Sequence, residues 1–161
     1  MVTAPTRHLA TRCAHAGASP RDADVPNAPF QQPIAQSTLF QLGTSAQAEA
    51  IFSGSRKGYA YSRFGNPSVE ALAEMLAGLE GGAGALVTSS GNAAVLCAVT
   101  AALEGRRGPL VTHHDIYGGS FELLRLLSEI HRVPVEVVDS TNLEVWLNAV
   151  SRAGAVLLET P

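Results

Sequence analysis

From residue 66 onward, the hydrophobic residues follow two spacings that are typical of helices and of buried strands. A helix is predicted to begin at Pro67, because Asn66 is a favoured N-cap and proline a favoured first helical residue. The apolar face of this helix recurs every three or four positions: Val69, Leu72, Leu76 and Leu79. Gly81 and Gly82 follow, and glycine at this position predicts the end of the helix.

The rest of this region consists of short apolar runs separated by segments of helix length. Four strands are predicted, over residues 85–88, 109–112, 133–138 and 155–159. Helices are predicted over residues 93–103 and 120–130, and after a capping box of Thr141 and Glu144. Because the strands are apolar throughout, the pattern favours right-handed βαβ crossovers and a mostly parallel sheet covered on both faces. The predicted fold class is therefore a three-layer α/β/α arrangement.

Residues 1–60 lack this regularity. They are rich in proline, glutamine, serine and threonine, and four prolines interrupt any regular pattern: Pro20, Pro26, Pro29 and Pro33. Only residues 45–53 are compatible with a short helix. We therefore expect residues 1–60 to form an extended arm that precedes the regular domain.

Composition and charge exclude several classes of protein. With 46% hydrophobic and 16% charged residues the chain can fill a core, and a net charge of −3 with scattered basic residues argues against nucleic-acid binding. The longest apolar run, residues 93–103, is well short of the roughly 20 residues that span a membrane, so we expect no membrane partner and a cytoplasmic location. Cys13 and Cys97 lack the spacing of metal ligands, and we interpret both as free thiols.

Two stretches about thirty residues apart have the character of a phosphate clamp. The first contains Tyr61 and Arg63, which offer a phenol and a guanidinium able to make paired bonds to phosphate oxygens. The second contains Ser90, Gly91 and Asn92, a small-residue turn at a helix start whose backbone N–H groups can point at an anion. An ordinary surface ion pair for the arginine, and an ordinary turn for Ser-Gly, are the structural alternatives.

Other candidates lie where ligands gather in parallel sheets, at the carboxyl ends of strands. Tyr117 follows the second predicted strand, where packing is the alternative to a functional role. Glu159 closes the last strand, and the choice between a binding role and the capping of a neighbouring helix stays open. We expect His113 and His114 to be packing or loop residues, and Lys57, the only lysine, to be a solvated loop charge.

Seven short motifs in the same order carry a family resemblance. They are Thr11 to Gly17, Gln32 to Thr38, Tyr61-Ser62-Arg63 with Asn66-Pro67, Leu79 to Gly82, Ser90-Gly91, Tyr117-Gly118-Gly119 and Glu159-Thr160-Pro161. The chain resembles the N-terminal part of the cystathionine γ-synthase family, the Cys/Met-metabolism enzymes that use pyridoxal phosphate. The resemblance implies an aspartate-aminotransferase-like (fold type I) domain that is incomplete at its C-terminus. Residues 61–161 would be the first part of that large cofactor-binding domain, and residues 1–60 an arm that contacts other subunits.

The resemblance also implies roles for individual residues. Tyr61 and Arg63 would hold the cofactor phosphate of the neighbouring subunit, and the backbone of Ser90, Gly91 and Asn92 would cradle the same phosphate from within the subunit. Tyr117 would stack on the pyridine ring and act as a catalytic residue that assists proton transfer. These roles imply a homo-oligomer, a dimer of dimers, with shared active sites and a small amino-acid substrate.

Among the activities of the family, the resemblance is greatest to cystathionine γ-synthase, which replaces the γ-substituent of an activated homoserine ester with cysteine. Cystathionine γ-lyase and homoserine-ester sulfhydrylase are the alternatives; Gly119 argues against methionine γ-lyase, which tends to have cysteine there. In the family, the lysine that binds the cofactor lies beyond Pro161. The chain is therefore expected to be a segment of a longer enzyme and inactive alone.

Two readings of another class compete with an enzyme. A Rossmann-like nucleotide-binding module would need G-x-G-x-x-G after its first strand, and residues 89–94 contain one glycine. A non-catalytic fragment that binds phosphate or joins oligomers is compatible with the sequence.

Overall fold

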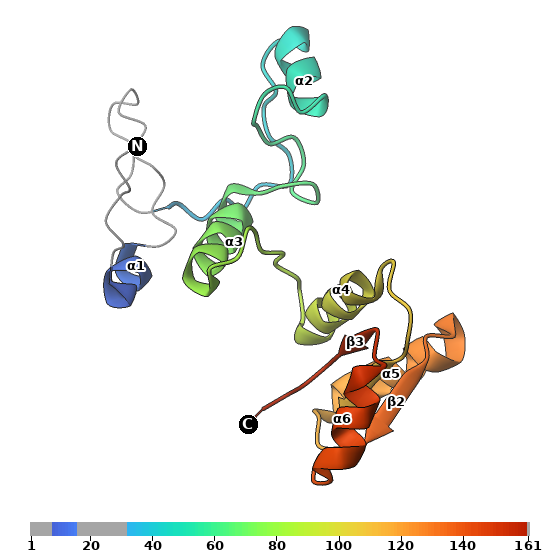
Figure 1. Cartoon of the computed structure of the whole chain (residues 1–161). Coiled ribbons are helices and arrows are strands. Elements are labelled where there is room, and N and C mark those ends of the chain that lie inside the picture. Colours follow the sequence, from blue (N-terminus) through green and yellow to red (C-terminus); the bar gives the residue numbers. More distant parts are fainter. Residues whose placement is uncertain (1–7, 16–31, 161) are drawn as a thin grey trace, which may run out of the picture. The chain divides into compact units, whose positions relative to one another are not determined.

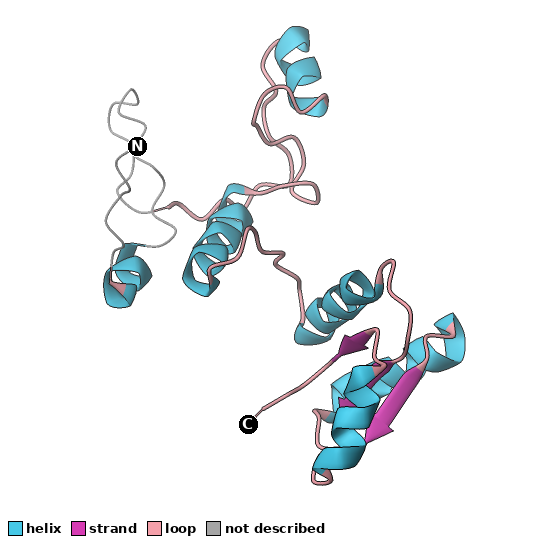
Figure 2. Cartoon of the chain, viewed as in Figure 1, coloured by secondary structure: helices cyan, strands magenta, loops and turns pink. Residues whose placement is uncertain are grey.

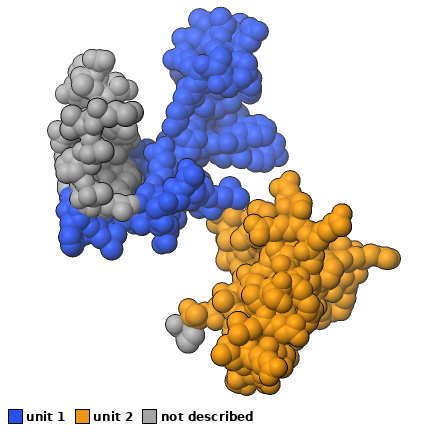
Figure 3. Space-filling view, viewed as in Figure 1, with its two compact units in different colours: residues 1–87 blue, residues 88–161 orange. Residues whose placement is uncertain are grey.

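The computed structural model describes residues 8–15 and 32–160, which belong to two compact units, Met1–Val87 and Thr88–Pro161 (Figure 3). We call these unit 1 and unit 2. Most of the prolines on which the expectation of an extended arm rests fall within residues 16–31, outside the described residues.

The described residues of unit 1 form three helices, α1 (Leu9–His15), α2 (Ser45–Phe52) and α3 (Pro67–Glu80) (Figure 1). The prediction that only residues 45–53 of the arm are helical was wrong, because α1 forms as well and packs against α3. Seven residues are too few to display a helical period, so this helix left no clear pattern in the sequence.

The ends of α3 are where the sequence predicts them. The Asn66 side chain accepts a hydrogen bond from the Ser68 N–H at 2.9 Å, and Pro67 takes the first helical position. Gly81 adopts a left-handed backbone conformation, with φ of 69°, and its N–H donates to the Ala77 carbonyl. Local capping residues therefore determine both ends of this helix.

Unit 2 contains a parallel sheet with strand order β2-β1-β3 and helices on both faces (Figure 2). The strands are β1 (Leu110–His113), β2 (Val135–Val138) and β3 (Ala155–Val156). The helices are α4 (Gly91–Leu103), α5 (Gly118–His131) and α6 (Leu143–Ser151). All four residues of β1 are buried, because this strand is central and is covered on both faces. The predicted α/β class with a parallel sheet is confirmed.

Two small cores on opposite faces of the sheet make the three layers. Leu110 of β1 packs with Leu124 and Leu127 of α5 and with Val99 of α4. The next residue, Val111, points to the other face and packs with Val138 and with Ala149 of α6. Alternation along one strand thus divides the helices of unit 2 between the two faces.

Three details of the predicted elements were wrong. Residues 85–88 form no strand, because they pair with no other strand among the described residues, and Leu86 is 72% exposed. Residues 155–159 form a strand over Ala155–Val156 only. The N-cap of α6 is Asn142, which accepts from the Val145 N–H at 3.2 Å, while Thr141 is held by the Asp139 carboxylate instead.

Candidate functional site

The candidate residues Tyr61 and Arg63 lie in a turn whose backbone is tied to an extended segment of unit 1. Tyr61 forms an antiparallel bridge with Leu39, and the Ser62 N–H donates to the Thr38 carbonyl at 2.9 Å. The Phe64 N–H donates to the Tyr61 carbonyl at 2.9 Å and closes the turn. The turn therefore holds Tyr61 and Arg63 in a defined local conformation.

Asn66 connects this turn to the same extended segment, a role that its N-cap position alone does not reveal. Its side chain is buried, and Nδ2 donates to the Ala35 carbonyl and to Ser62 Oγ, each at 3.0 Å. Ser62 Oγ in turn donates to the Ser37 carbonyl in a short hydrogen bond. One buried amide thus supports α3 and the Tyr61–Arg63 turn together.

The Arg63 guanidinium lies over two aromatic rings. Its Cζ atom is 5.1 Å from the centroid of the Tyr61 ring and 5.4 Å from that of Phe64, within the range of a cation–π interaction. The two rings meet edge to face, with centroids 6.0 Å apart. Arg63 is exposed and makes no ion pair with a carboxylate of residues 8–15 or 32–160. Its N–H donors are available to an external anion.

The loop before this turn is attached to α3 by polar contacts. The Tyr59 hydroxyl donates to Glu70 Oε2 at 2.8 Å, and burial together with this carboxylate raises the pKa of Tyr59 to about 12. Lys57 Nζ lies 3.5 Å from both Glu70 and Glu74. The Lys57 side chain is 74% exposed, which confirms the prediction of a solvated loop charge.

The second candidate stretch, in unit 2, begins helix α4. Ser90 is the N-cap, and its Oγ accepts from the Ala93 N–H at 3.3 Å. The N–H groups of Gly91 and Asn92 have no acceptor within the described residues, and both residues are exposed. Free amides at the positive end of a helix dipole fit the phosphate group of pyridoxal phosphate.

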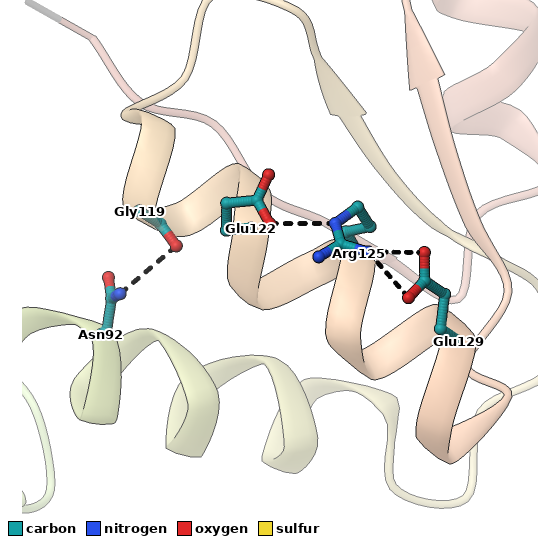
Figure 4. A network of polar contacts seen from close by, with 5 residues as sticks. All are labelled: Asn92, Gly119, Glu122, Arg125 and Glu129. Carbon is teal, nitrogen blue, oxygen red and sulfur yellow. Dashed lines mark hydrogen bonds and ion pairs between the residues drawn. The ribbon is translucent and has the colours of Figure 1, made fainter.

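Tyr117 lies beside this turn. Asn92 Nδ2 donates to the Gly119 carbonyl at 3.3 Å, which links the first turns of α4 and α5 (Figure 4). A Cβ atom on Gly119 would overlap Tyr117 Cε1 and would lie 3.1 Å from Tyr117 Cζ and 3.2 Å from Asn92 Nδ2. The tyrosine ring therefore passes directly over Gly119, while the residue as a whole remains 69% exposed. Unit 2 brings Ser90, Gly91, Asn92 and Tyr117 to one surface.

Further along α5, Figure 4 also shows Arg125 between Glu122 and Glu129. Arg125 Nε donates to Glu122 at 2.9 Å, and Nη1 donates to Glu129 at 2.7 Å, at spacings of three and four residues. All three side chains are largely exposed, so these pairs stabilise the helix only weakly. They are a feature of the helix surface.

Glu159 caps helix α5, which is the alternative left open in the sequence. Its Oε2 accepts from the Tyr117 N–H at 2.5 Å and its Oε1 accepts from the Ser120 hydroxyl at 2.5 Å. The Ser120 hydrogen bond, followed by that of the Tyr117 N–H, lowers the pKa of Glu159 below its ordinary value of 4.5. Ser120 is 2% exposed and was missed as a site residue, because serine in the first turn of a helix is common.

The Glu159 cap predicts a pH dependence of stability. Since the folded-state pKa is lowered, the contribution of this carboxylate is complete above about pH 5 and is lost as the pH falls through the folded pKa. We expect the difference in free energy of unfolding between wild type and Glu159→Gln to be constant from about pH 7 to about pH 5 and to shrink at lower pH. Urea unfolding of both full-length proteins at several pH values measures this difference in free energy of unfolding. A difference that grows with acidity would contradict the assignment.

His113, the last residue of β1, and His114, which follows it, are packing and loop residues respectively, as predicted. His113 is 8% exposed, and its ring meets Trp146 edge to face with centroids 6.4 Å apart. Its Nδ1 atom has no hydrogen-bond partner within the part of the chain that the structure describes. His114 is exposed in the loop before Tyr117.

Two further observations bear on the class of protein. Cys13 and Cys97 are both exposed free thiols, as predicted. Over the described ranges, no helix has the length and apolar character needed to cross a bilayer.

Comparison with known proteins supports the resemblance found in the sequence. The chain is similar to O-succinylhomoserine sulfhydrylase of Mycobacterium tuberculosis, with 37% identity over 123 residues that cover 76% of this chain and 30% of that protein. It is similar to O-acetyl-L-homoserine sulfhydrylase of Corynebacterium glutamicum, with 39% identity over 127 residues, 79% of this chain and 28% of that protein. The chain therefore spans about 30% of the length of these curated relatives.

The fold has a matching solved structure. The crystal structure of cystathionine gamma synthase from Xanthomonas oryzae pv. oryzae, in complex with aminoacrylate and cysteine, aligns with a TM-score of 0.71 and 31% identity. The alignment covers 96% of this chain and 37% of that chain, and it confirms the predicted fold type I class for this partial domain. The family profile described as Cys/Met metabolism PLP-dependent enzyme matches residues 10–161. Matched over almost its whole length, the chain belongs to this family of pyridoxal-phosphate-dependent enzymes.

Proposed function

We propose that this chain belongs to a cystathionine γ-synthase. It supplies the backbone amides that bind the phosphate of the cofactor and the tyrosine that covers the pyridine ring. Such an enzyme takes an activated homoserine ester and exchanges its γ-substituent for cysteine. The observation that carries the proposal is the pair of free N–H groups at the start of α4, with Tyr117 on the same surface. When bound, pyridoxal phosphate withdraws electrons from the α-carbon of an amino acid.

The α4 turn binds the phosphate in this proposal. The N–H groups of Gly91 and Asn92 donate to the phosphate oxygens, and Ser90 leaves them free because its own Oγ is taken by Ala93. The Asn92 side chain is occupied with the Gly119 carbonyl, so its backbone is the part assigned to the anion. The turn thus orients the cofactor by its phosphate.

Tyr117 acts at the other end of the cofactor in this proposal. Its ring is largely exposed, so one face is available to stack on a flat heterocycle. Its phenol moves a proton to the leaving group of the substrate. The ring lies over Gly119, where the absence of a side chain leaves room for it.

Tyr61 and Arg63 complete the phosphate site of the neighbouring subunit in this proposal. Arg63 makes no ion pair with a described carboxylate, and its two aromatic neighbours orient the guanidinium without occupying its N–H donors. A phosphate from another subunit would satisfy these donors. The assembly proposed is a cytoplasmic homotetramer, a dimer of dimers with shared active sites.

The choice of reaction rests on Gly119 and on the relatives. A cysteine at position 119 would overlap the Tyr117 ring and crowd the Asn92 side chain, so the glycine found there argues against a methionine γ-lyase. The two curated relatives are named sulfhydrylases, so replacement by sulfide in place of cysteine is the second candidate. Lys57, the only lysine of residues 1–161, is paired with Glu70 and Glu74. We therefore assign no cofactor-binding lysine to these residues and propose that they are inactive by themselves.

The test uses the full-length enzyme with an O-acyl homoserine and either cysteine or sulfide. With cysteine as the second substrate, we expect cystathionine to be the main product. Homocysteine from sulfide as the main product would instead support the second candidate, and release of a 2-oxo acid from cystathionine would indicate a γ-lyase. If the absorbance of pyridoxal phosphate does not shift when the enzyme is added and no product forms, an enzymatic role is contradicted.

Variants of the same enzyme test the shared site. Arg63→Ala is expected to weaken pyridoxal phosphate binding roughly tenfold, because a charge-assisted hydrogen bond is lost, whereas Arg56→Ala in the same unit has no effect. When Arg63→Ala and Tyr117→Ala subunits are mixed at a limiting pyridoxal phosphate concentration, the mixture is expected to be more active than either variant alone, since each mixed dimer then has one site with both residues intact. If mixing restores nothing, Arg63 and Tyr117 serve the same subunit.

A further inference from the structure

Helix α5 begins differently from the other helices whose N-caps are described. Those begin with a side chain that accepts a hydrogen bond from their own first turn: Thr44, Asn66, Ser90 and Asn142. Helix α5 has Tyr117 at its N-cap, and the tyrosine side chain makes no capping hydrogen bond. Serine, threonine, aspartate or asparagine would be favoured at this position on local grounds. A residue that violates a local rule suggests a functional demand at its position.

The missing cap comes from a residue 42 positions later in the chain. Both carboxylate oxygens of Glu159 are used, one by the Tyr117 N–H and one by the Ser120 hydroxyl, each at 2.5 Å. The Ser120 end of this bridge is fully buried. A carboxylate at the start of a helix is also favoured by the helix dipole.

The segment that carries Glu159 is itself fixed to the central strand. The Leu157 N–H donates to the Val111 carbonyl at 2.9 Å, and Thr112 Oγ1 donates to the Leu157 carbonyl at 3.0 Å. The segment after β3 is therefore attached to β1, the most buried strand of unit 2, and Glu159 in this segment contacts the backbone of Tyr117. The Tyr117 side chain has little packing of its own, since the residue is 69% exposed.

We propose that Glu159 is a positioning residue for Tyr117, holding its backbone where the ring can cover the cofactor. This inference rests on the function proposed above for Tyr117. Glu159 does not touch the substrate in this assignment; it acts through the Tyr117 N–H and through Ser120. Loss of the carboxylate lets the first turn of α5 fray, and the exposed ring moves with it.

The test is a double-mutant cycle in the full-length holoenzyme, combined with amide hydrogen exchange of the apoenzyme. Glu159→Ala is expected to lower kcat roughly tenfold and to speed exchange over residues 117–120, because misplaced catalytic groups lower kcat. Glu159→Gln keeps one acceptor oxygen and is expected to restore most of both. In the Tyr117→Ala background, Glu159→Ala is expected to have no further effect on kcat.

Asp139→Ala is the matched control. The Asp139 carboxylate also accepts from a backbone N–H and a hydroxyl before a helix, those of Thr141 at 2.9 and 2.6 Å, but that helix carries no candidate residue. Its removal is expected to change exchange near Thr141 and to leave kcat unchanged. An Asp139→Ala loss of kcat equal to that of Glu159→Ala would overturn the proposal.

Other results separate this proposal from the proposed function. If Glu159→Ala lowers kcat equally with and without Tyr117, Glu159 acts elsewhere and only the positioning role is overturned. If hydrogen exchange rises in Glu159→Ala but kcat is unchanged, the contact is structural only and the positioning role is overturned.

If Tyr117→Ala itself leaves kcat unchanged, the proposed role of Tyr117 fails, and the positioning role of Glu159 fails with it. If Glu159→Ala does not fold, Ser120→Ala, which releases one carboxylate oxygen, must show the same coupling to Tyr117.

Discussion

Replacing Gly108 with alanine is expected to destabilise unit 2 by roughly 3 kcal/mol or more, above the range of most single substitutions, because it combines a steric clash with backbone strain. Gly108 has φ of 112°, a region that residues with a side chain rarely adopt. A Cβ atom there would overlap the Arg152 carbonyl oxygen and would lie 2.8 Å from the Gly154 nitrogen and 3.1 Å from the Ala153 carbonyl carbon. These backbone atoms cannot move aside, because the Gly154 N–H donates to the Pro109 carbonyl at 2.9 Å as β1 and β3 begin.

Urea unfolding of the full-length protein measures this loss of stability. Gly105→Ala is the control, since Gly105 also has a positive φ, 67°, but an added Cβ would have no heavy atom within 4 Å. The control is expected to cost about 1 kcal/mol through backbone strain alone. Equal losses for the two variants would mean that the close approach of Gly108 to the backbone of residues 152–154 contributes nothing.

Gly119→Ala is expected to have the opposite character, with folding preserved and activity reduced roughly 100-fold. An added Cβ would overlap the Tyr117 ring, which is largely exposed and can rotate away into solvent. Alanine is also a better helix former than glycine, so the stability of α5 does not fall. The measurements are kcat of the full-length enzyme and its melting temperature, made on the same preparation.

Gly118→Ala is the matched control for this variant. Gly118 lies in the same first turn of α5, and an added Cβ there would have no heavy atom within 4 Å. The control is expected to retain wild-type kcat. If Gly119→Ala also retained it, the orientation of the Tyr117 ring would be irrelevant to the reaction.

The elements that the sequence predicts well are those determined by neighbouring residues. Helix α3 begins and ends where Asn66 and Gly81 predict, because caps act within one turn. The strand expected over residues 85–88 is absent, since a strand also needs a partner, and an apolar run does not show whether one is present. At α6, Thr141 and Asn142 are both good caps, and the nearby Asp139 decides between them by binding Thr141.

The candidate site also contains both local features that the sequence predicts and distant contacts that it does not. Ser90, Gly91 and Asn92 could be predicted at a helix start, because a small polar cap followed by an apolar run is a local signal. The contacts that organise the site join residues far apart in the chain, such as Asn66 with Ala35 and Glu159 with Ser120. Sequence spacing carries no record of these pairs, so it does not identify Ser120 and leaves both a binding role and a capping role open for Glu159.

During synthesis of the chain, the cap of α5 can form only late, because Glu159 lies 42 residues after Tyr117. The chain emerges from the ribosome N-terminus first, so Tyr117 is outside the ribosome before Glu159 is available to bind its N–H. Until then the first turn of α5 has an open amide and an unanchored aromatic ring, and the nascent helix can only fluctuate there. The first turn of α5 and Tyr117 are therefore fixed only when the segment after β3 docks against β1.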